Sequence, residues 1–99
     1  MSLLVHYTLK DPGDHAAQVE AMNALVAGLK SESPAGVHYS CFETGDPAKF
    51  VGVLEFEDDD GKQRFLQSEA FASYRAAVTD LLAGPPETTE ITAIASTRA

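Results

Sequence analysis

Two basic side chains, at positions 6 and 75, are the first candidates for chemistry in this sequence. His6 lies within the apolar run 3–9, where an imidazole that titrates near neutral pH can act as a general base. The alternative is a structural histidine that is hydrogen-bonded inside the protein. Arg75 falls on the apolar side of a predicted helix, where a guanidinium needs an anionic or carbonyl partner. That partner is either an oxygen of a substrate or a carboxylate such as Glu55 or Glu43.

Aromatic side chains are the next candidates, because they can form the apolar wall of a substrate pocket. Phe56, Phe65 and Phe71 have the spacing for this role, although aromatic residues at such spacings also form ordinary core. Tyr74 directly precedes Arg75 and is expected in the core, with its hydroxyl at the edge of the pocket. The sequence leaves the pocket and core roles of these residues open.

The other histidines and the single cysteine carry weaker signals. His38 and Tyr39 are neighbours on a predicted strand and point to opposite faces, so they do not form a dyad. Cys41 is expected to be a small buried apolar residue, because nothing beside it in the sequence would activate a thiolate. His15 is expected at the solvent edge of a helix rather than in a ligand set.

The sequence predicts a protein without metal, haem or flavin. The CxxC and HxxxH metal-binding spacings are absent, and a single cysteine permits no disulfide within the chain. The acidic run 58–60 lacks the ligand spacing of a calcium loop and suits the start of a helix. No glycine-rich phosphate loop follows a predicted strand.

The composition predicts one soluble, cytoplasmic domain over residues 1–99. The chain is 44% hydrophobic and 22% charged, which is ordinary for a globular protein. Its net charge of −8 opposes binding to nucleic acid and to anionic membranes. No basic and apolar leader begins the sequence, and no apolar run reaches the roughly 20 residues that a membrane span needs.

The elements that must position these residues follow a β-α-β-β-α-β order. Strands are expected over 3–9, 37–44, 49–57 and 88–96. One helix is expected after Asp14, a short one over 58–67, and a longer one from Ser68 to the stop at 84–86. This order predicts an α+β, ferredoxin-like fold: an antiparallel four-stranded sheet with its helices on one face.

The first strand is apolar on both faces, which bears on assembly and on the site. One alternating set is Leu3, Val5, Tyr7 and Leu9, and the other is Leu4, His6 and Thr8. Counting back from the turn glycine, Gly13, predicts that the second set faces the helices, so that His6 and Arg75 border one cavity. The sheet face without helices then needs another cover, and a second copy of the chain is the predicted one.

Short segments in this order resemble the antibiotic-biosynthesis-monooxygenase-like (ABM) family of dimeric α/β barrels. The resemblance covers nearly the whole chain. Its markers are Lys10-Asp11-Pro12-Gly13, Gly45-Asp46-Pro47 with Phe50, Leu54-Glu55-Phe56-Glu57, Ser68-Glu69-Ala70-Phe71 and Leu81-Leu82-Ala83-Gly84-Pro85-Pro86. The resemblance implies the ferredoxin-like fold and a homodimer.

The activities that the resemblance implies are diverse, from cofactor-free oxygenation of aromatic or quinol substrates to haem degradation and isomerisation. Members of the family typically carry a Trp where this chain has Phe56, and often a His where it has Phe65. Haem-degrading relatives use an Asn, a Trp and a His at positions that match His6, Phe65 and Arg75 here. All three residues differ, and without a helical histidine to bind iron, haem degradation is disfavoured.

The leading hypothesis is a homodimeric, cofactor-independent monooxygenase-like oxidoreductase. It would bind a small apolar or aromatic molecule, such as a quinol, between its sheet and helices. His6 would remove a proton, and Arg75 or Tyr74 would hold the developing oxyanion. The alternatives are a non-catalytic ligand-binding or structural homodimer and a small-molecule isomerase or decarboxylase. A pocket of roughly 300 Å³ or more lined by His6 and Arg75 would favour the enzyme, and a collapsed interior the structural dimer.

Overall fold

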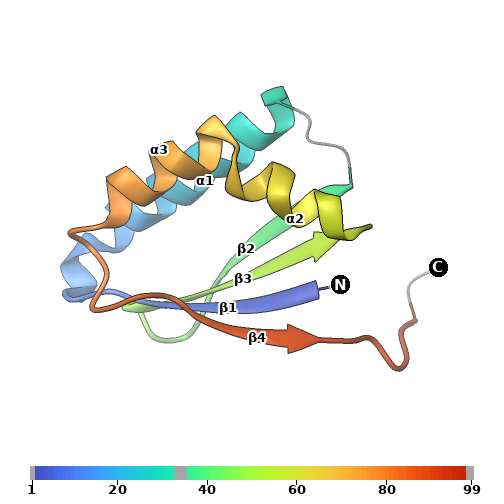
Figure 1. Cartoon of the computed structure of the whole chain (residues 1–99). Helices are drawn as coiled ribbons and strands as arrows, with labels where there is room; N and C mark the ends of the chain where they lie inside the picture. The colour runs from blue at the N-terminus through green and yellow to red at the C-terminus, as the bar shows by residue number, and fades with distance from the viewer. Residues whose placement is uncertain (1, 33–35, 98–99) are drawn as a thin grey trace.

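The described residues form a four-stranded antiparallel sheet with three α-helices on one face (Figure 1). The structure is a computed structural model that describes residues 2–32 and 36–97. Its elements in chain order are β1 (Ser2–Thr8), the 3-10 turn η1 (Pro12–Asp14), α1 (His15–Glu32), β2 (Val37–Glu43), β3 (Lys49–Phe56), α2 (Asp59–Leu66), α3 (Glu69–Val78) and β4 (Glu87–Ile91). The strand order β2-β3-β1-β4 confirms the predicted α+β, ferredoxin-like fold.

Side-chain caps fix where the helices begin. The Asp58 carboxylate accepts a hydrogen bond from the Gly61 N–H at 2.8 Å, and the Ser68 hydroxyl accepts one from the Phe71 N–H at 3.2 Å. Before α1, the Asp11 carboxylate caps the 3-10 turn η1, where it accepts a hydrogen bond from the Gly13 N–H at 2.8 Å. This cap lies three residues before the predicted Asp14, because a 3-10 turn precedes the helix.

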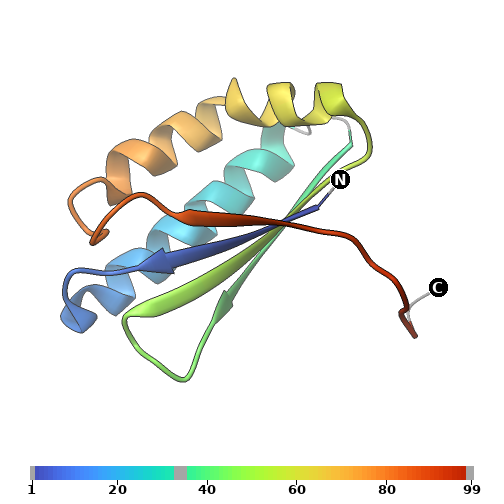
Figure 2. The same cartoon turned by 60° about the horizontal axis from the view of Figure 1, so that its bottom comes forward.

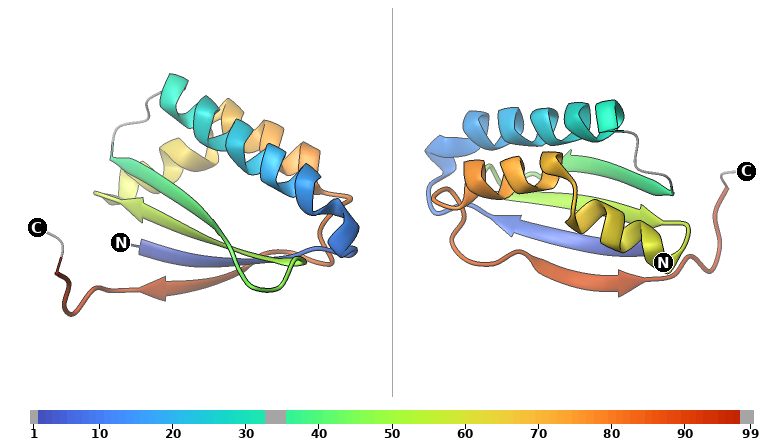
Figure 3. Two further views of the ribbon diagram at one scale, coloured as in Figure 1. Left: turned by 180° about the vertical axis from the view of Figure 1, so that it is seen from behind. Right: turned by 45° about the horizontal axis from the view of Figure 1, so that its top comes forward.

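Helices α1 and α3 lie side by side over the sheet (Figure 3) and meet at small residues. A Cβ added to Gly28 would lie 2.8 Å from the Cβ of Ala70, so a larger residue does not fit without a shift. Their buried faces consist of Gln18, Met22, Leu25 and Leu29 from α1 and Ala70, Tyr74 and Val78 from α3. The close approach holds α3 above β1 and β3, where it can roof a site.

Strand β1 turns its odd-numbered side chains toward the helices, opposite to the prediction. Val5 and Tyr7 are 5% and 4% exposed, whereas His6 and Thr8 are exposed. The prediction that Leu4, His6 and Thr8 face the helices is therefore wrong. The odd-numbered set contains four apolar side chains, and the free energy gained by burying them decides which face of β1 turns inward. The turn glycine, Gly13, is a poor guide to that face because irregular chain separates it from the strand.

Strand β4 is shorter than predicted and ends at Ile91. Ile91 pairs with Ser2, the first described residue of β1, so the chain beyond it has no described neighbour in the sheet. That chain runs away from the sheet (Figure 2), and Ile94 is 99% exposed. The predicted strand residues 92–96 are therefore not in the sheet.

The opposite face of the sheet carries no helix in the described part of the chain (Figures 1 and 3). Leu4, Val51 and Val53 are half-buried on this face, and Phe42 is 52% exposed. His6 lies among them, paired with Val51 of β3 on one side and with Glu87 of β4 on the other. This apolar patch is where the predicted second copy of the chain would pack.

On the helix side of the sheet, His15 ties the start of α1 to the β2–β3 hairpin. Its Nδ1 lies 2.8 Å from the Pro47 carbonyl oxygen, its Nε2 lies 3.0 Å from Glu43 Oε1, and its ring stacks on Phe50. Both partners only accept hydrogen bonds when Glu43 is ionised, so the doubly protonated ring satisfies both contacts. The Pro47 carbonyl, followed by the Glu43 carboxylate, raises the pKa of His15 above its usual 6.5.

We predict that His15 stabilises the fold in a pH-dependent way. Because its pKa is raised on folding, its contribution is fully present below pH 6.5 and is lost as the pH rises through the higher pKa of the folded state. The difference in melting temperature between the wild type and His15→Gln should therefore shrink between pH 6 and pH 9. His38→Gln, on the exposed pair with Glu57 at 3.6 Å, is the control. A His15→Gln difference that is constant with pH would contradict the prediction.

Candidate functional site

A cavity of about 580 Å³ lies between the sheet and helices α2 and α3. Strands β1, β2 and β3 form its floor, the two helices form its roof and one wall, and residues 82–88 close another side. The volume lies within the range of about 300 to 1,000 Å³ that small-molecule sites occupy. The interior is therefore open, and the structure does not have the collapsed core expected of a purely structural dimer.

Five of the predicted site residues line this cavity: Phe56, Phe65, Phe71, Tyr74 and Arg75. The sixth, His6, is exposed on the opposite face of the sheet. The prediction that His6 and Arg75 border one cavity is therefore wrong, because Val5 and Tyr7 hold the inward positions of β1. As placed, His6 cannot act as a base on a molecule in this cavity.

Phe65 is the centre of the aromatic wall. Its ring lies 4.5 Å from that of Phe71 and 6.2 Å from that of Phe56, measured between centroids. It also stacks on Tyr39, at 5.9 Å and an interplanar angle of 15°. Flat aromatic surfaces from β2, β3, α2 and α3 therefore converge on one space, which suits a flat, aromatic ligand.

Tyrosine hydroxyls form the polar part of the cavity. The hydroxyls of Tyr7 and Tyr39 are hydrogen-bonded to each other across the sheet. The Tyr74 hydroxyl accepts a hydrogen bond from Nε2 of the fully buried Gln18 at 2.9 Å, and the Tyr7 and Tyr74 rings meet edge to face at 6.0 Å. Three elements thus bring all three tyrosines of the chain to one place.

Gly52 makes this cluster possible. It lies on β3 between Cys41 of β2 and Val5 of β1, and a Cβ there would come within 2.6 Å of the Tyr39 hydroxyl oxygen. The missing side chain lets the Tyr39 ring lean across β3 toward Tyr7. A glycine inside a strand is the one sequence signal that pointed to this close approach.

The hydroxyls of the cluster are neutral at physiological pH. Burial raises the pKa of Tyr7, Tyr39 and Tyr74 above the usual 10. Burial also raises the pKa of the half-buried Cys41 thiol to about 11, so Cys41 is not an activated thiolate. These groups can therefore hydrogen-bond an oxygen of a ligand, but they are not bases near neutral pH.

Arg75 borders the cavity without the structural ion pair that the sequence left open. Its guanidinium lies over the Phe71 ring, 5.7 Å from the centroid. Glu43 pairs with His15, and Glu55 is exposed on the helix-free side of the sheet. Within the described ranges no carboxylate forms an ion pair with Arg75, so its charge is available to a ligand.

Two further pairs of charged groups belong to local structure. Asp58 caps α2 and pairs with Arg64 at 3.1 Å, and His38 lies 3.6 Å from Glu57 on the surface. Among residues 2–32 and 36–97, no cluster of three or more His, Cys, Asp or Glu side chains could hold a metal ion. The same residues include no helix long and apolar enough to cross a membrane.

This arrangement of sheet and helices recurs in solved structures. A protein of unknown function from Nitrosomonas europaea is 22% identical, with a TM-score of 0.79 over 99% of this chain and 92% of that one. The PA3566 protein from Pseudomonas aeruginosa is 24% identical, with a TM-score of 0.79 over 95% and 93%. A protein named antibiotic biosynthesis monooxygenase is 16% identical, with a TM-score of 0.77 over 96% of this chain and all of that one.

The chain has the antibiotic biosynthesis monooxygenase-like fold. The resemblance predicted from short segments of the sequence is confirmed at this level. No protein-family model matches the chain, and no curated protein matches it significantly. A fold alone does not fix a function, so function has to be argued from the cavity itself.

We predict that Gly52→Ala destabilises the ABM-like fold by displacing Tyr39. The added Cβ would clash with the Tyr39 hydroxyl and break its hydrogen bond to Tyr7, at a cost of about 1–3 kcal/mol. Urea unfolding measures the change. Gly45→Ala is the matched control, because a Cβ there would meet nothing within 4 Å. Equal stability of the two variants would show that Tyr39 does not depend on Gly52.

Proposed function

We propose that the cavity binds a small, flat, aromatic molecule that carries a hydroxyl or carbonyl oxygen. The observation that supports this most strongly is the open space of about 580 Å³ between an aromatic wall and a cluster of tyrosine hydroxyls. An apolar pocket with a few convergent polar groups is typical of small-molecule sites. Phenols, quinols and anthrones have this combination of a flat ring and one or two oxygens.

We further propose that the bound molecule is oxygenated without metal, haem or flavin, with the substrate itself as the electron source. For an anthrone, the reacting ring carbon would lose two hydrogens and gain one oxygen from O₂, and the other oxygen would leave as water. Arg75 would stabilise the oxyanion of the deprotonated substrate, and the Tyr74 hydroxyl would hydrogen-bond a neutral oxygen of the same molecule. No His, Asp or Glu is among the described residues that line the cavity, so the proton would pass to solvent.

The same observation supports a second candidate, a non-catalytic binding protein for such a molecule. A general base within reach of the substrate typically contributes 100-fold or more to a rate, and the lining residues that the structure describes include none that acts near neutral pH. A ligand that is bound and released unchanged needs no base. The two candidates differ in whether the bound molecule gains mass under oxygen.

A screen of quinols and anthrones under oxygen, with product mass as the readout, tests the oxygenation proposal. Turnover should survive treatment with a chelator, and the purified protein should show no visible absorption band. Arg75→Gln should lower turnover about 100-fold, since it removes a charged donor to the oxyanion. Lys10→Gln, an exposed cation outside the cavity, is the control. Binding without any change in product mass would leave the non-catalytic candidate.

We also propose that two copies of the chain pack through the helix-free face of the sheet. Leu4, Val51, Val53 and Phe42 form an apolar patch there, and a stable dimer would bury more than about 1,200 Å² in total. Light scattering at micromolar concentration should give twice the chain mass. Phe42→Asp should shift it toward the monomer, and Leu66→Asp should not, because Leu66 is 45% exposed on the helix side. A wild-type monomer would contradict the proposal.

A further inference from the structure

The cavity is lined by positive charge in a strongly negative protein. The chain has fifteen Asp and Glu against seven Lys and Arg, a net charge of −8. Yet the ionisable side chains that line the cavity, apart from the tyrosines, are Lys62 of α2 and Arg75 of α3, as far as the described residues go. The charged side chains that reach the cavity are therefore both positive, which favours an anionic ligand over a cationic one.

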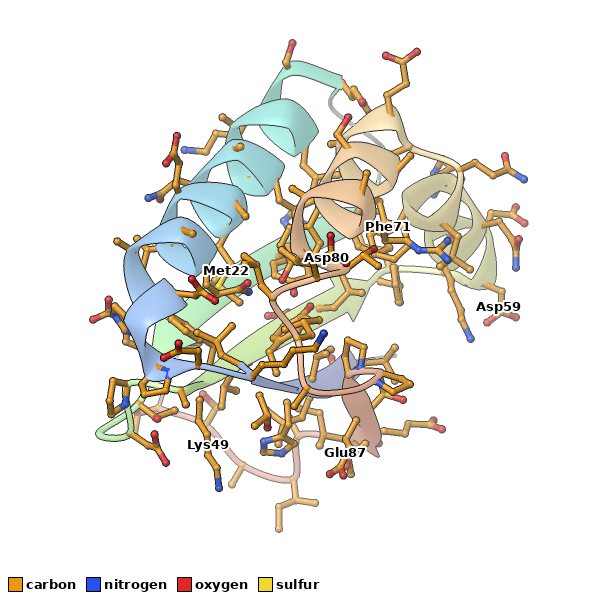
Figure 4. All side chains as sticks on the ribbon, turned by 90° about the vertical axis from the view of Figure 1, so that its left-hand side faces the viewer. Met22, Lys49, Asp59, Phe71, Asp80 and Glu87 are labelled. Carbon is orange, nitrogen blue, oxygen red and sulfur yellow. The ribbon has the colours of Figure 1, made fainter. Side chains whose placement is uncertain are left out.

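The two cations flank the aromatic pair of the wall. Lys62 precedes Phe65 by about one turn of α2, and Arg75 follows Phe71 by about one turn of α3. The rings of Phe65 and Phe71 lie 4.5 Å apart, and the Arg75 guanidinium lies over Phe71. Figure 4 shows Phe71 on the side of α3 that faces α2. An aromatic ring bound against Phe65 and Phe71 would thus lie near Lys62 of α2 and Arg75 of α3.

Neither cation is neutralised by the protein. In the described part of the chain, the carboxylates of the acidic run at the start of α2 are engaged elsewhere or open to solvent: Asp58 pairs with Arg64 at 3.1 Å, and Asp59 and Asp60 are exposed in the first turn. No ion pair joins a carboxylate to Lys62 or to Arg75 in these residues. Both side chains are themselves exposed, so an anionic group can reach them while it keeps part of its hydration.

The buried floor of the cavity and its exposed helix side suit different groups of a ligand. The floor is buried, with Tyr7 and Tyr74 each 4% exposed, and its polar atoms are neutral hydroxyls. A carboxylate there would lose its hydration without gaining a countercharge, which strongly disfavours it. At Lys62 or Arg75 the same group would meet a positive charge next to water. An acidic group therefore belongs at the helices and a neutral oxygen at the tyrosines.

We propose that the ligand is an aromatic carboxylate, with its acid group between Lys62 and Arg75 and its ring against Phe65 and Phe71. A hydroxyl or carbonyl at the far end of the ring system would meet the tyrosine cluster. This inference rests on the proposed binding function and names the chemical class of the ligand.

Calorimetric titration with a matched pair of probes, 6-hydroxy-2-naphthoic acid and 2-naphthol, tests the inference. Both are flat and carry one hydroxyl, and the first adds a carboxylate. At 50 mM salt the acid should bind at least 10-fold more tightly than the naphthol. That advantage should shrink at 0.5 M salt, because exposed charges are screened.

Variants separate the anion subsite from general damage to the cavity. Lys62→Met should weaken the acid several-fold and leave the naphthol unchanged. Arg75→Met should weaken the acid more than the naphthol, since Arg75 also contacts the Phe71 ring of the wall, and Lys62→Arg should retain the preference. Equal affinity for the two probes, or a variant that weakens both equally, would overturn the anion subsite while leaving the binding function in place. Failure of both probes to bind the wild type would contradict the binding function itself, and the inference with it.

Discussion

The hydrogen bond between the hydroxyls of Tyr7 and Tyr39 is the contact on which the site depends. It joins β1 to β2 across the strand between them, and it requires the space that Gly52 leaves in β3. Both rings must lie on the helix side of the sheet for it to form. That phase of β1 sends His6 to the opposite face. The phase of β1, which burial of its odd-numbered side chains favours and which allows this contact, thus gives the cavity its polar floor and removes from it the most obvious base in the sequence.

Among the described residues that line it, the cavity consequently offers binding groups and no base that titrates near neutral pH. Its polar groups are neutral hydroxyls at the floor and exposed cations at the helices, with an aromatic pair between them. In the proposed binding mode, a neutral oxygen of the ligand would meet the hydroxyls and a negatively charged group would meet the cations, and this match would orient the ligand. Any reaction there must draw on the reactivity of the substrate itself, as cofactor-free oxygenation of a quinol or anthrone does. The ABM-like fold positions the elements around the cavity, and the residues that line the cavity determine what it can bind.

Local patterns predicted the elements well, and contacts between distant residues explain what they missed. The caps Asp58 and Ser68, the strand order and the aromatic wall follow from turns, spacing and apolar periodicity. The face of β1 was predicted wrongly, because both of its alternating sets contain apolar residues. The buried position of Gln18 was missed. Its hydrogen-bond partner, Tyr74, lies on another helix, and nothing in the local sequence around Gln18 indicates that contact. Tyr39 was missed because its role depends on a glycine in the neighbouring strand.

The binding claim can be tested through the tyrosines themselves, since the chain contains three and all of them line the cavity. With tyrosine labelled by ¹³C at Cζ, each hydroxyl-bearing carbon gives an NMR signal that responds to its hydrogen bonds. Titration with 6-hydroxy-2-naphthoic acid should shift the signals of Tyr7, Tyr39 and Tyr74 together and to saturation. Saturable binding that leaves all three signals in place would contradict the claim, because the ligand would then lie outside the cavity.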